Sequence, residues 1–243
     1  MSNIFPPGNF TLDRSENDLS LHIHRIGAQV PNLFTLQAED RIKITGGRGG
    51  SFYYKSSPKG LIVRQYLRGG MMRFVSHDKF VSLSKDPLLY RPFRELQILN
   101  YLACNNVSVP EVMAASVKRS GFLYRGMLAT TVIEGSRNLA ELNQKNCELV
   151  LIERFAEKAA EQALDVLKLG IFHPDLHPAN VIVDAAGNIY LIDFDNAFKI
   201  SNNLIGRLDL LKRWIRYCHK YQLSEGLVRG FERGMSGNNH GRF

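Results

Sequence analysis

Hydrophobic residues in the first half of the chain come in short runs that polar and glycine-rich turns separate, which is the pattern of β-strands. The runs predict strands at 42–44, 52–55, 61–66, 112–117 and 122–133. The first three are separated only by the glycine-rich segment 46–51 and by a turn at 56–60. Turns this short join antiparallel neighbours, so we expect a β-meander.

The first 35 residues are polar and irregular, and Leu19, Leu21 and Ile23 alternate enough for one short strand. We therefore expect an N-terminal extension over residues 1–35. Residues 36–134 would form one lobe made of the sheet and one helix, and 135–243 a second lobe. Glu134–Gly135 interrupts the strand pattern and is the predicted hinge.

Helical spacing of apolar residues appears later in the chain. It predicts helices over 87–104 and 147–169, the second ending at Gly170. A third apolar face consists of Leu204, Leu208, Leu211, Ile215 and Cys218, and basic residues occupy other positions of this helix. Two interpretations stay open: a helix packed on the core with a solvated basic face, or a helix that contacts a membrane surface.

These elements predict an α+β fold of two lobes, an antiparallel sheet with one helix followed by a shortened, mainly helical lobe. The chain has 243 residues, of which 44% are hydrophobic, enough for a substantial core. Its formal charge of +8 favours an anionic partner such as a nucleotide, a nucleic acid, a phosphorylated sugar or an acidic membrane. Charge alone does not choose among them.

Three cysteines without metal-ligand spacing predict reduced thiols in a cytosolic protein. The first residues have neither a basic start nor a continuous apolar segment, and no run approaches the roughly 18 apolar residues of a spanning helix. We expect a soluble or peripheral protein.

The segment from Phe172 to Asn180, with Asp193 thirteen residues further on, carries the most specific chemistry. Phosphoryl transfer needs a carboxylate that accepts the proton of the attacking hydroxyl, and we assign this role to Asp175. It also needs oxygen ligands for Mg²⁺, and Asn180 and Asp193 would supply them. Asp and Asn also favour ordinary turns, but the joint spacing favours a catalytic site.

The pattern His-x-Asp-Leu-x-x-x-Asn followed by Asp-Phe-x resembles the catalytic and metal-binding segments of the protein-kinase-like superfamily. Asp195 stands where that superfamily has the Gly of Asp-Phe-Gly. His177 stands where protein kinases commonly have a lysine that reaches the transferred phosphate. His177 could donate a hydrogen bond to phosphate or only stabilise the loop, and both interpretations stay open.

The glycine-rich segment contributes Gly46, Gly47, Arg48, Gly49 and Gly50. Without Cβ atoms, its backbone amides can approach phosphate oxygens closely. Taken alone the segment is an ordinary hairpin turn. Its position ahead of the metal-binding motif favours phosphate binding.

The resemblance also implies an ion pair that holds a basic residue of the third strand against the triphosphate. Arg64 stands where the superfamily has its lysine, and Glu95 is the candidate helix carboxylate. A guanidinium binds carboxylate and phosphate oxygens, but it is not equivalent to an ammonium. A solvated helix face is the alternative for Glu95.

Three features narrow the resemblance to the bacterial kinases of 3-deoxy-D-manno-octulosonic acid (Kdo): the run Val63–Gly70, the Gly47–Gly49 loop, and His173-x-Asp175 with Ile192–Asp195. The resemblance implies transfer of the γ-phosphoryl group of ATP, with Mg²⁺, to a hydroxyl of Kdo on a lipid A precursor. It further implies peripheral contact with the cytoplasmic face of the inner membrane.

Other functions stay open. A kinase for another small hydroxyl substrate, of the heptose or aminoglycoside type, would use the same motifs. A pseudokinase could hold nucleotide without turnover, although Asp175, Asn180 and Asp193 are all present. Charge alone suggests nucleic-acid binding, and no RNA-binding motif or zinc spacing supports it, so we expect no nucleic-acid partner.

Overall fold

A computed structural model describes residues 7–15, 19–44, 50–55, 60–67, 78–82, 86–145 and 148–237. The chain divides into two compact units. The first unit comprises Met1–Tyr101 and Glu111–Val132, and the second comprises Leu102–Pro110 and Ile133–Phe243. The first is mostly antiparallel sheet and the second mostly helical, so the predicted kinase-like α+β fold is confirmed. The residue limits predicted for the extension and the lobes stay predictions.

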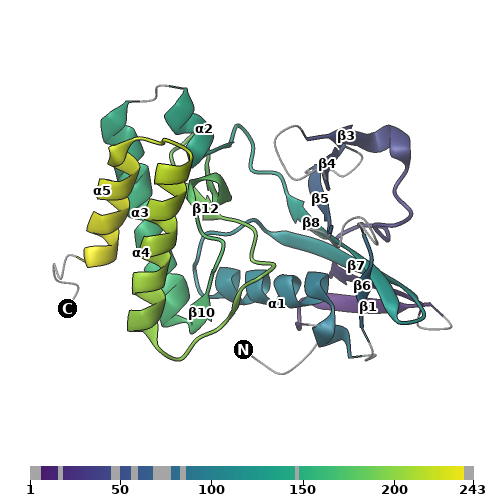
Figure 1. The fold of residues 1–243 in the computed structure, drawn as a ribbon. Helices are drawn as coiled ribbons and strands as arrows, with labels where there is room; N and C mark the ends of the chain where they lie inside the picture. Colours follow the sequence, from purple (N-terminus) through teal and green to yellow (C-terminus); the bar gives the residue numbers. More distant parts are fainter. Residues whose placement is uncertain are drawn as a thin grey trace. The chain divides into compact units, whose positions relative to one another are not determined.

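One antiparallel sheet dominates the first unit (Figure 1). Its strands are β1 (Phe10–Arg14), β2 (Ser20–Arg25), β3 (Arg41–Lys43), β4 (Ser51–Tyr54), β5 (Leu61–Gln65), β6 (Phe80–Val81), β7 (Val112–Ser120) and β8 (Leu123–Thr131). They lie in the order β1-β2-β7-β8-β5-β4-β3, and β6 also pairs with β8. Since β3, β4 and β5 are neighbours, the predicted meander is confirmed.

The N-terminal segment is more regular than its sequence predicts. It forms two strands rather than one, and β2 continues the sheet by pairing with β7, with Leu21 opposite Val117 and Ile23 opposite Ala115. Ile23 is fully buried. The strand predicted from Leu19, Leu21 and Ile23 is confirmed as β2, whereas β1 was not predicted, because pairing with β2 rather than local pattern stabilises it.

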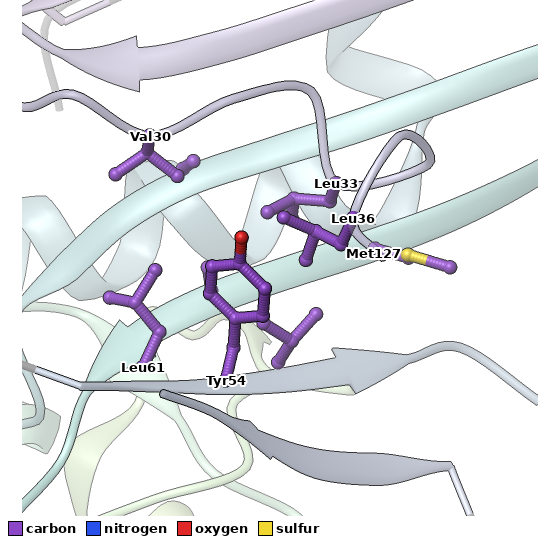
Figure 2. Packing of buried hydrophobic residues seen from close by; sticks show 9 residues of the cluster. Val30, Leu33, Leu36, Tyr54, Leu61 and Met127 are labelled. Carbon is purple, nitrogen blue, oxygen red and sulfur yellow. The ribbon is translucent and has the colours of Figure 1, made fainter. Parts of the chain in front are cut away.

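A buried cluster covers the β4–β5 end of the sheet (Figure 2). The segment between β2 and β3, which includes a 3-10 turn at Ala38–Asp40, brings Val30, Leu33 and Leu36 over the ring of Tyr54. Leu61 of β5 lies beside that ring. These contacts hold the meander that carries Arg64.

The helix α1 spans Arg91–Cys104, and a 3-10 turn at Pro87–Leu89 precedes it. Asp86 caps this turn by accepting a hydrogen bond from the Leu88 amide at 2.9 Å. Phe93 and Leu96 of α1 are fully buried, and Glu95 lies between them on the chain. The helix predicted over 87–104 is therefore confirmed, with its first residues in the tighter turn.

The second unit packs helices around two small sheets. Its elements are β9 (Arg137–Asn138), α2 (Leu139–Gln144), α3 (Leu149–Lys168), β10 (Ile171–Phe172), β11 (Val181–Val183), β12 (Ile189–Leu191), β13 (Phe198–Lys199), α4 (Asn203–Lys220) and α5 (Glu225–Ser236). The helices α3, α4 and α5 lie side by side (Figure 1). As predicted, Gly170 stops α3: the helix ends at Lys168, and Gly170 follows with a φ of 73° that favours glycine.

The helix α4 buries a different face from the predicted one. Its buried residues are Gly206, Leu210, Trp214 and Cys218. Trp214 stacks on Phe231 of α5 at 4.0 Å and donates a hydrogen bond to the Leu227 carbonyl. A Cβ at position 206 would lie 2.8 Å from a methyl carbon of Leu167, so glycine lets α4 approach α3 closely.

This packing turns part of the predicted apolar face outward. Leu204 is 66% exposed and Leu208 is 51% exposed, so the interpretation that packs this face on the core is wrong for these two residues, and the membrane-contact interpretation stays a prediction. The prediction placed the buried face along the leucines. In the structure the buried face instead contains Gly206, which packs against α3, and Trp214, which stacks on α5. Leu211 and Ile215 are half-buried at the boundary.

The cysteines of the described residues are free thiols. Cys104 is exposed and Cys218 is buried, and Cys147 lies outside the described residues. Burial raises the pKa of the Cys218 thiol to about 12, so this side chain is a packing residue. Within the described ranges, no helix combines the length and apolar character that crossing a membrane requires.

Candidate active site

Asp175 lies in the loop between β10 and β11. His173 anchors this loop: it is buried, and its Nε2 donates a hydrogen bond to the Ile192 carbonyl at 2.9 Å. Its ring also packs on Phe194 at 4.4 Å. Residues 173–180, the predicted catalytic loop, are therefore bound to the segment on either side of Asp193.

Asp175 has a partner that the sequence did not reveal. The side-chain nitrogen of Asn196 donates a hydrogen bond to Asp175 Oδ2 at 2.7 Å. This contact fixes the plane of the carboxylate through Oδ2, while the predicted role of Asp175 as the base stays a prediction. Asn196 follows Asp193 by three residues, and that closeness to the motif is the one signal that could have identified it.

The two predicted metal ligands are brought together by a β-hairpin. In the β11–β12 ladder Val181 lies opposite Leu191, and the next rung is a hydrogen bond from the Ile192 amide to the Asn180 carbonyl at 3.1 Å. Asp193 follows directly, with a φ of 68° that turns the chain out of the ladder. The hairpin register therefore places Asn180 beside the start of the Asp193 turn.

The Asn180 amide is oriented by the loop. Its Nδ2 donates a hydrogen bond to the Asp175 carbonyl at 2.8 Å, so Oδ1 is the atom that would bind a cation. One amide oxygen and one carboxylate fit Mg²⁺, which keeps several waters and needs few protein ligands. Among the described residues, no three or more His, Cys, Asp or Glu side chains form a group that could hold a metal ion.

His177 lies against α4. Its ring stacks on Tyr217 at 4.1 Å, and its Nε2 lies 3.4 Å from the Asn180 side-chain nitrogen. Burial is the main cause that lowers the pKa of His177, and the neighbouring His173 lowers it further. A neutral ring is therefore expected at pH 7. Its predicted contact with phosphate stays a prediction and would be a neutral hydrogen bond rather than an ion pair.

The helix α4 makes a second contact with the loop that carries Asp175. Arg213 donates a hydrogen bond to the Pro174 carbonyl at 3.1 Å and pairs with Asp209 one helical turn away. With Tyr217 this makes two contacts from one helix to the residues that flank Asp175. Neither contact could be predicted from the sequence, because the partners are about forty positions apart in the chain.

In the first unit, Arg64 and Glu95 form the predicted ion pair. Glu95 is 2% exposed, and its carboxylate accepts hydrogen bonds from both Arg64 and the Tyr66 hydroxyl. Arg64 also lies over the Tyr66 ring, with its guanidinium carbon 4.9 Å from the ring centroid. The solvated-face alternative for Glu95 is excluded, while the role of the pair in nucleotide binding stays a prediction.

The predicted phosphate loop is only partly within the described residues. Gly46, Gly47, Arg48 and Gly49 lie outside them. Gly50 continues the β4–β5 pairing, because its carbonyl accepts a hydrogen bond from the Gln65 amide at 2.7 Å. A Cβ at position 50 would lie 2.6 Å from the Gln65 carbonyl oxygen, so the strands approach this closely only with glycine. The role of the loop in binding phosphate stays a prediction.

Replacing Glu95 with glutamine should destabilise the protein by about 2 kcal/mol. The change removes the negative charge beside Arg64 while keeping the size of the side chain. Loss of one partner of a buried pair costs roughly 3–5 kcal/mol, and the side chain of Arg64 is 25% exposed, which reduces that cost. Urea-induced unfolding measures the difference.

Glu111→Gln is the matched control, since Glu111 pairs with Arg25 at 3.3 Å and is 44% exposed. That variant should lose less than about 1 kcal/mol. Equal losses in the two variants would contradict a special role for burial in the Arg64–Glu95 pair.

The stability of the protein should fall as the pH is lowered through about 6.5. Burial lowers the pKa values of His22, His173 and His177 below the ordinary 6.5. The folded protein therefore keeps these rings neutral while the unfolded chain takes up protons. Their contribution is complete above about pH 6.5 and is lost progressively towards their lowered pKa values.

Thermal unfolding between about pH 5.5 and 7.5 tests this, because unperturbed carboxylates titrate below that window. His22 is the residue to change: its Nδ1 lies 2.8 Å from the Ser116 hydroxyl and its Nε2 3.0 Å from the Val30 carbonyl, away from Asp175 along the chain and in the other unit. His22→Gln should show a shallower dependence on pH. A melting temperature that stays constant or rises on acidification would contradict the prediction.

The fold and the site together define the class of the protein. An aspartate in a loop after a short strand, followed by an asparagine and an aspartate at the open end of a hairpin, is the arrangement of kinase-like phosphotransferases. The antiparallel sheet with its buried Arg64–Glu95 pair is the matching arrangement in the first unit.

The chain belongs to the lipopolysaccharide kinase (Kdo/WaaP) family, whose model matches residues 36–232. It is 36% identical over 152 residues to a 3-deoxy-D-manno-octulosonic acid kinase of Xanthomonas oryzae pv. oryzae. It is 31% identical over 152 residues to the Stenotrophomonas maltophilia protein of that name, and 30% over 153 residues to that of Xylella fastidiosa. Each match covers 62% of this chain and 58% of the relative.

Proposed function

We propose that this protein transfers the γ-phosphoryl group of ATP to a hydroxyl of the Kdo residue on a lipid A precursor. One observation carries the proposal. The β11–β12 ladder places Asn180 beside the start of the Asp193 turn, and the Asn180 side chain donates a hydrogen bond to the Asp175 carbonyl. The family and the names of the relatives support Kdo as the acceptor.

Asp175 would accept the proton of the acceptor hydroxyl as that oxygen attacks the γ-phosphorus. Asn196 holds one carboxylate oxygen, which orients the other towards the hydroxyl. The bond from the γ-phosphorus to the bridging oxygen of ADP breaks, and the Kdo hydroxyl oxygen becomes the phosphate ester oxygen. The Arg64 guanidinium, oriented by Glu95, would bind phosphate oxygens.

Asn180 Oδ1 and the Asp193 carboxylate would hold Mg²⁺, which when bound neutralises negative charge on the phosphate oxygens. The neutral ring of His177, placed by Tyr217, could donate one hydrogen bond to the phosphate. The backbone of Gly46–Gly50 would bind the remaining phosphate oxygens, as its glycines allow.

The acceptor proposed here is linked to lipid, so we further propose peripheral contact with an anionic membrane at the cytoplasmic face. The formal charge of +8 supports this partner.

The test is to incubate the purified chain with ATP, Mg²⁺ and a Kdo-lipid A precursor and to follow the mass of the sugar lipid. A gain of one phosphate on the Kdo residue, absent in Asp175→Ala, is the expected result. No gain on Kdo, together with a gain on a heptose-containing core or an aminoglycoside, would replace this proposal by the alternative kinase. Nucleotide binding without transfer to any acceptor would indicate a pseudokinase.

A further inference from the structure

The outward face of α4 combines apolar and basic residues in separate halves. In its first two turns, Leu204, Ile205 and Leu208 are 66%, 61% and 51% exposed. Phe198, shortly before the helix, is 49% exposed. Exposed aliphatic side chains gathered on consecutive turns are unusual on a solvated surface, and such groups mark contact sites.

The second half of the same face is basic. Lys212, Arg216, His219 and Lys220 are exposed and, with Ile215, line a surface hollow of about 670 Å³. The only acidic residue of α4 is Asp209, which pairs with Arg213. No acidic side chain of this helix therefore compensates the exposed basic residues.

This helix is bound to the catalytic loop. Arg213 donates a hydrogen bond to the Pro174 carbonyl, and Tyr217 stacks on His177. Both contacts come from the half of α4 that carries the exposed basic residues. Because α4 contacts Pro174 and His177, only this helix would separate a partner bound to its outer face from the loop that carries Asp175.

We propose that the outward face of α4 docks on an anionic phospholipid bilayer. Leu204, Ile205 and Leu208 enter the boundary between headgroups and acyl chains, and Lys212 and Arg216 contact lipid phosphates. This docking proposal rests on the proposed function, in which the acceptor is linked to lipid. Docking through α4 would bring the catalytic loop to the membrane surface where that acceptor lies.

The charge and apolar pattern favours a bilayer over other anionic partners. A nucleic acid would match the basic half but leave the three aliphatic side chains in water. A bilayer matches both, since basic residues near anionic headgroups and aliphatic residues below them each stabilise interfacial helices. Because the aliphatic and the basic half of α4 share one exposed face, they can contact the acyl-chain boundary and the headgroups at the same time.

Co-sedimentation with vesicles tests the docking in the absence of nucleotide and sugar. The full chain should bind vesicles of phosphatidylglycerol and phosphatidylethanolamine and bind phosphatidylcholine vesicles weakly. Lys212→Gln with Arg216→Gln should lower the partition coefficient about 30-fold, because each basic residue near an anionic surface contributes about 1 kcal/mol. Ile205→Ser with Leu208→Ser should lower it at least about tenfold.

The matched controls are Leu149→Ser, which changes a 59% exposed leucine of α3, and Lys145→Gln, an exposed lysine after α2. Both should bind vesicles like the unchanged protein. The other substituted side chains all lie on the outer face of α4. Circular dichroism verifies that each variant is folded.

The docking proposal is overturned if the unchanged protein does not bind anionic vesicles, or if the control variants lose as much binding as the α4 variants. It is also overturned if the α4 variants lose affinity only for a single-stranded nucleic acid. These results are independent of catalysis. A protein that docks but phosphorylates no acceptor would overturn the proposed function and leave the docking proposal supported.

Discussion

Replacement of Asp175 by alanine should lower turnover by about 10²–10⁴-fold, the usual contribution of a positioned general base. The affinity for ATP should change little, because the residues proposed to bind the nucleotide are elsewhere. Steady-state phosphorylation of the acceptor and calorimetric titration with ATP measure the two quantities separately. Turnover close to that of the unchanged enzyme would contradict the assignment of Asp175 as the base.

Asp165→Ala provides the matched control, since Asp165 is an exposed carboxylate of α3 that pairs with Lys168 of the same helix. Its loss should leave turnover unchanged. Asn196→Ala should give an intermediate loss, because Asn196 orients Asp175 through one hydrogen bond. The decrease should appear in kcat rather than in KM for ATP, as expected of a positioning residue.

Replacement of Asp193 by asparagine should reduce turnover by on the order of 10²-fold or more, since charge stabilisation by a bound metal is worth several kcal/mol. Asparagine tolerates the positive φ of 68° at this position, so the backbone turn can persist. Loss of the negative charge should weaken Mg²⁺ binding. The dependence of the rate on Mg²⁺ concentration should therefore shift to higher concentrations.

The control for this change is Asp184→Asn, at the opposite end of the same hairpin, where Asp184 accepts hydrogen bonds from Asn188 and Ala186. Those bonds lower the pKa of Asp184, so the variant tests hairpin stability without touching the proposed metal ligands. An unchanged Mg²⁺ dependence in Asp193→Asn, or an equal shift in Asp184→Asn, would remove Asp193 from the metal site.

The elements that could be predicted from the sequence are those with strong local patterns. The strands at 42–44, 52–55 and 61–66 appear as β3, β4 and β5, within about a residue. The long helix before Gly170 appears as α3. In each case, alternation or helical spacing of apolar residues agrees with the face that the fold buries.

The elements that could not be predicted depend on partners far away in the chain. The strands β1 and β2 form because β2 pairs with β7, about ninety residues later. The orientation of α4 depends on Gly206 and Trp214 packing against α3 and α5. A helix with leucines on one side and arginines on another has two plausible buried faces, and only the shape of the neighbours selects one.

For the candidate site, the intervals between Asp175, Asn180 and Asp193 were informative because a short loop and one hairpin join them. Asn196, Tyr66 and Tyr217 were missed, since a polar or aromatic side chain carries no signal of the residue it will contact. The pairing of Arg64 with Glu95 was predictable only through the resemblance to known kinases.

The sequence by itself determined the kind of chemistry, because carboxylate, amide and guanidinium groups at these intervals suit phosphate and Mg²⁺ whatever surrounds them. Only the tertiary structure decided how Asp175 is held, which face of α4 stays exposed, and that this helix contacts the catalytic loop. The reason is physical: the identity of a side chain sets what it can bind, whereas close packing of distant segments sets where it points.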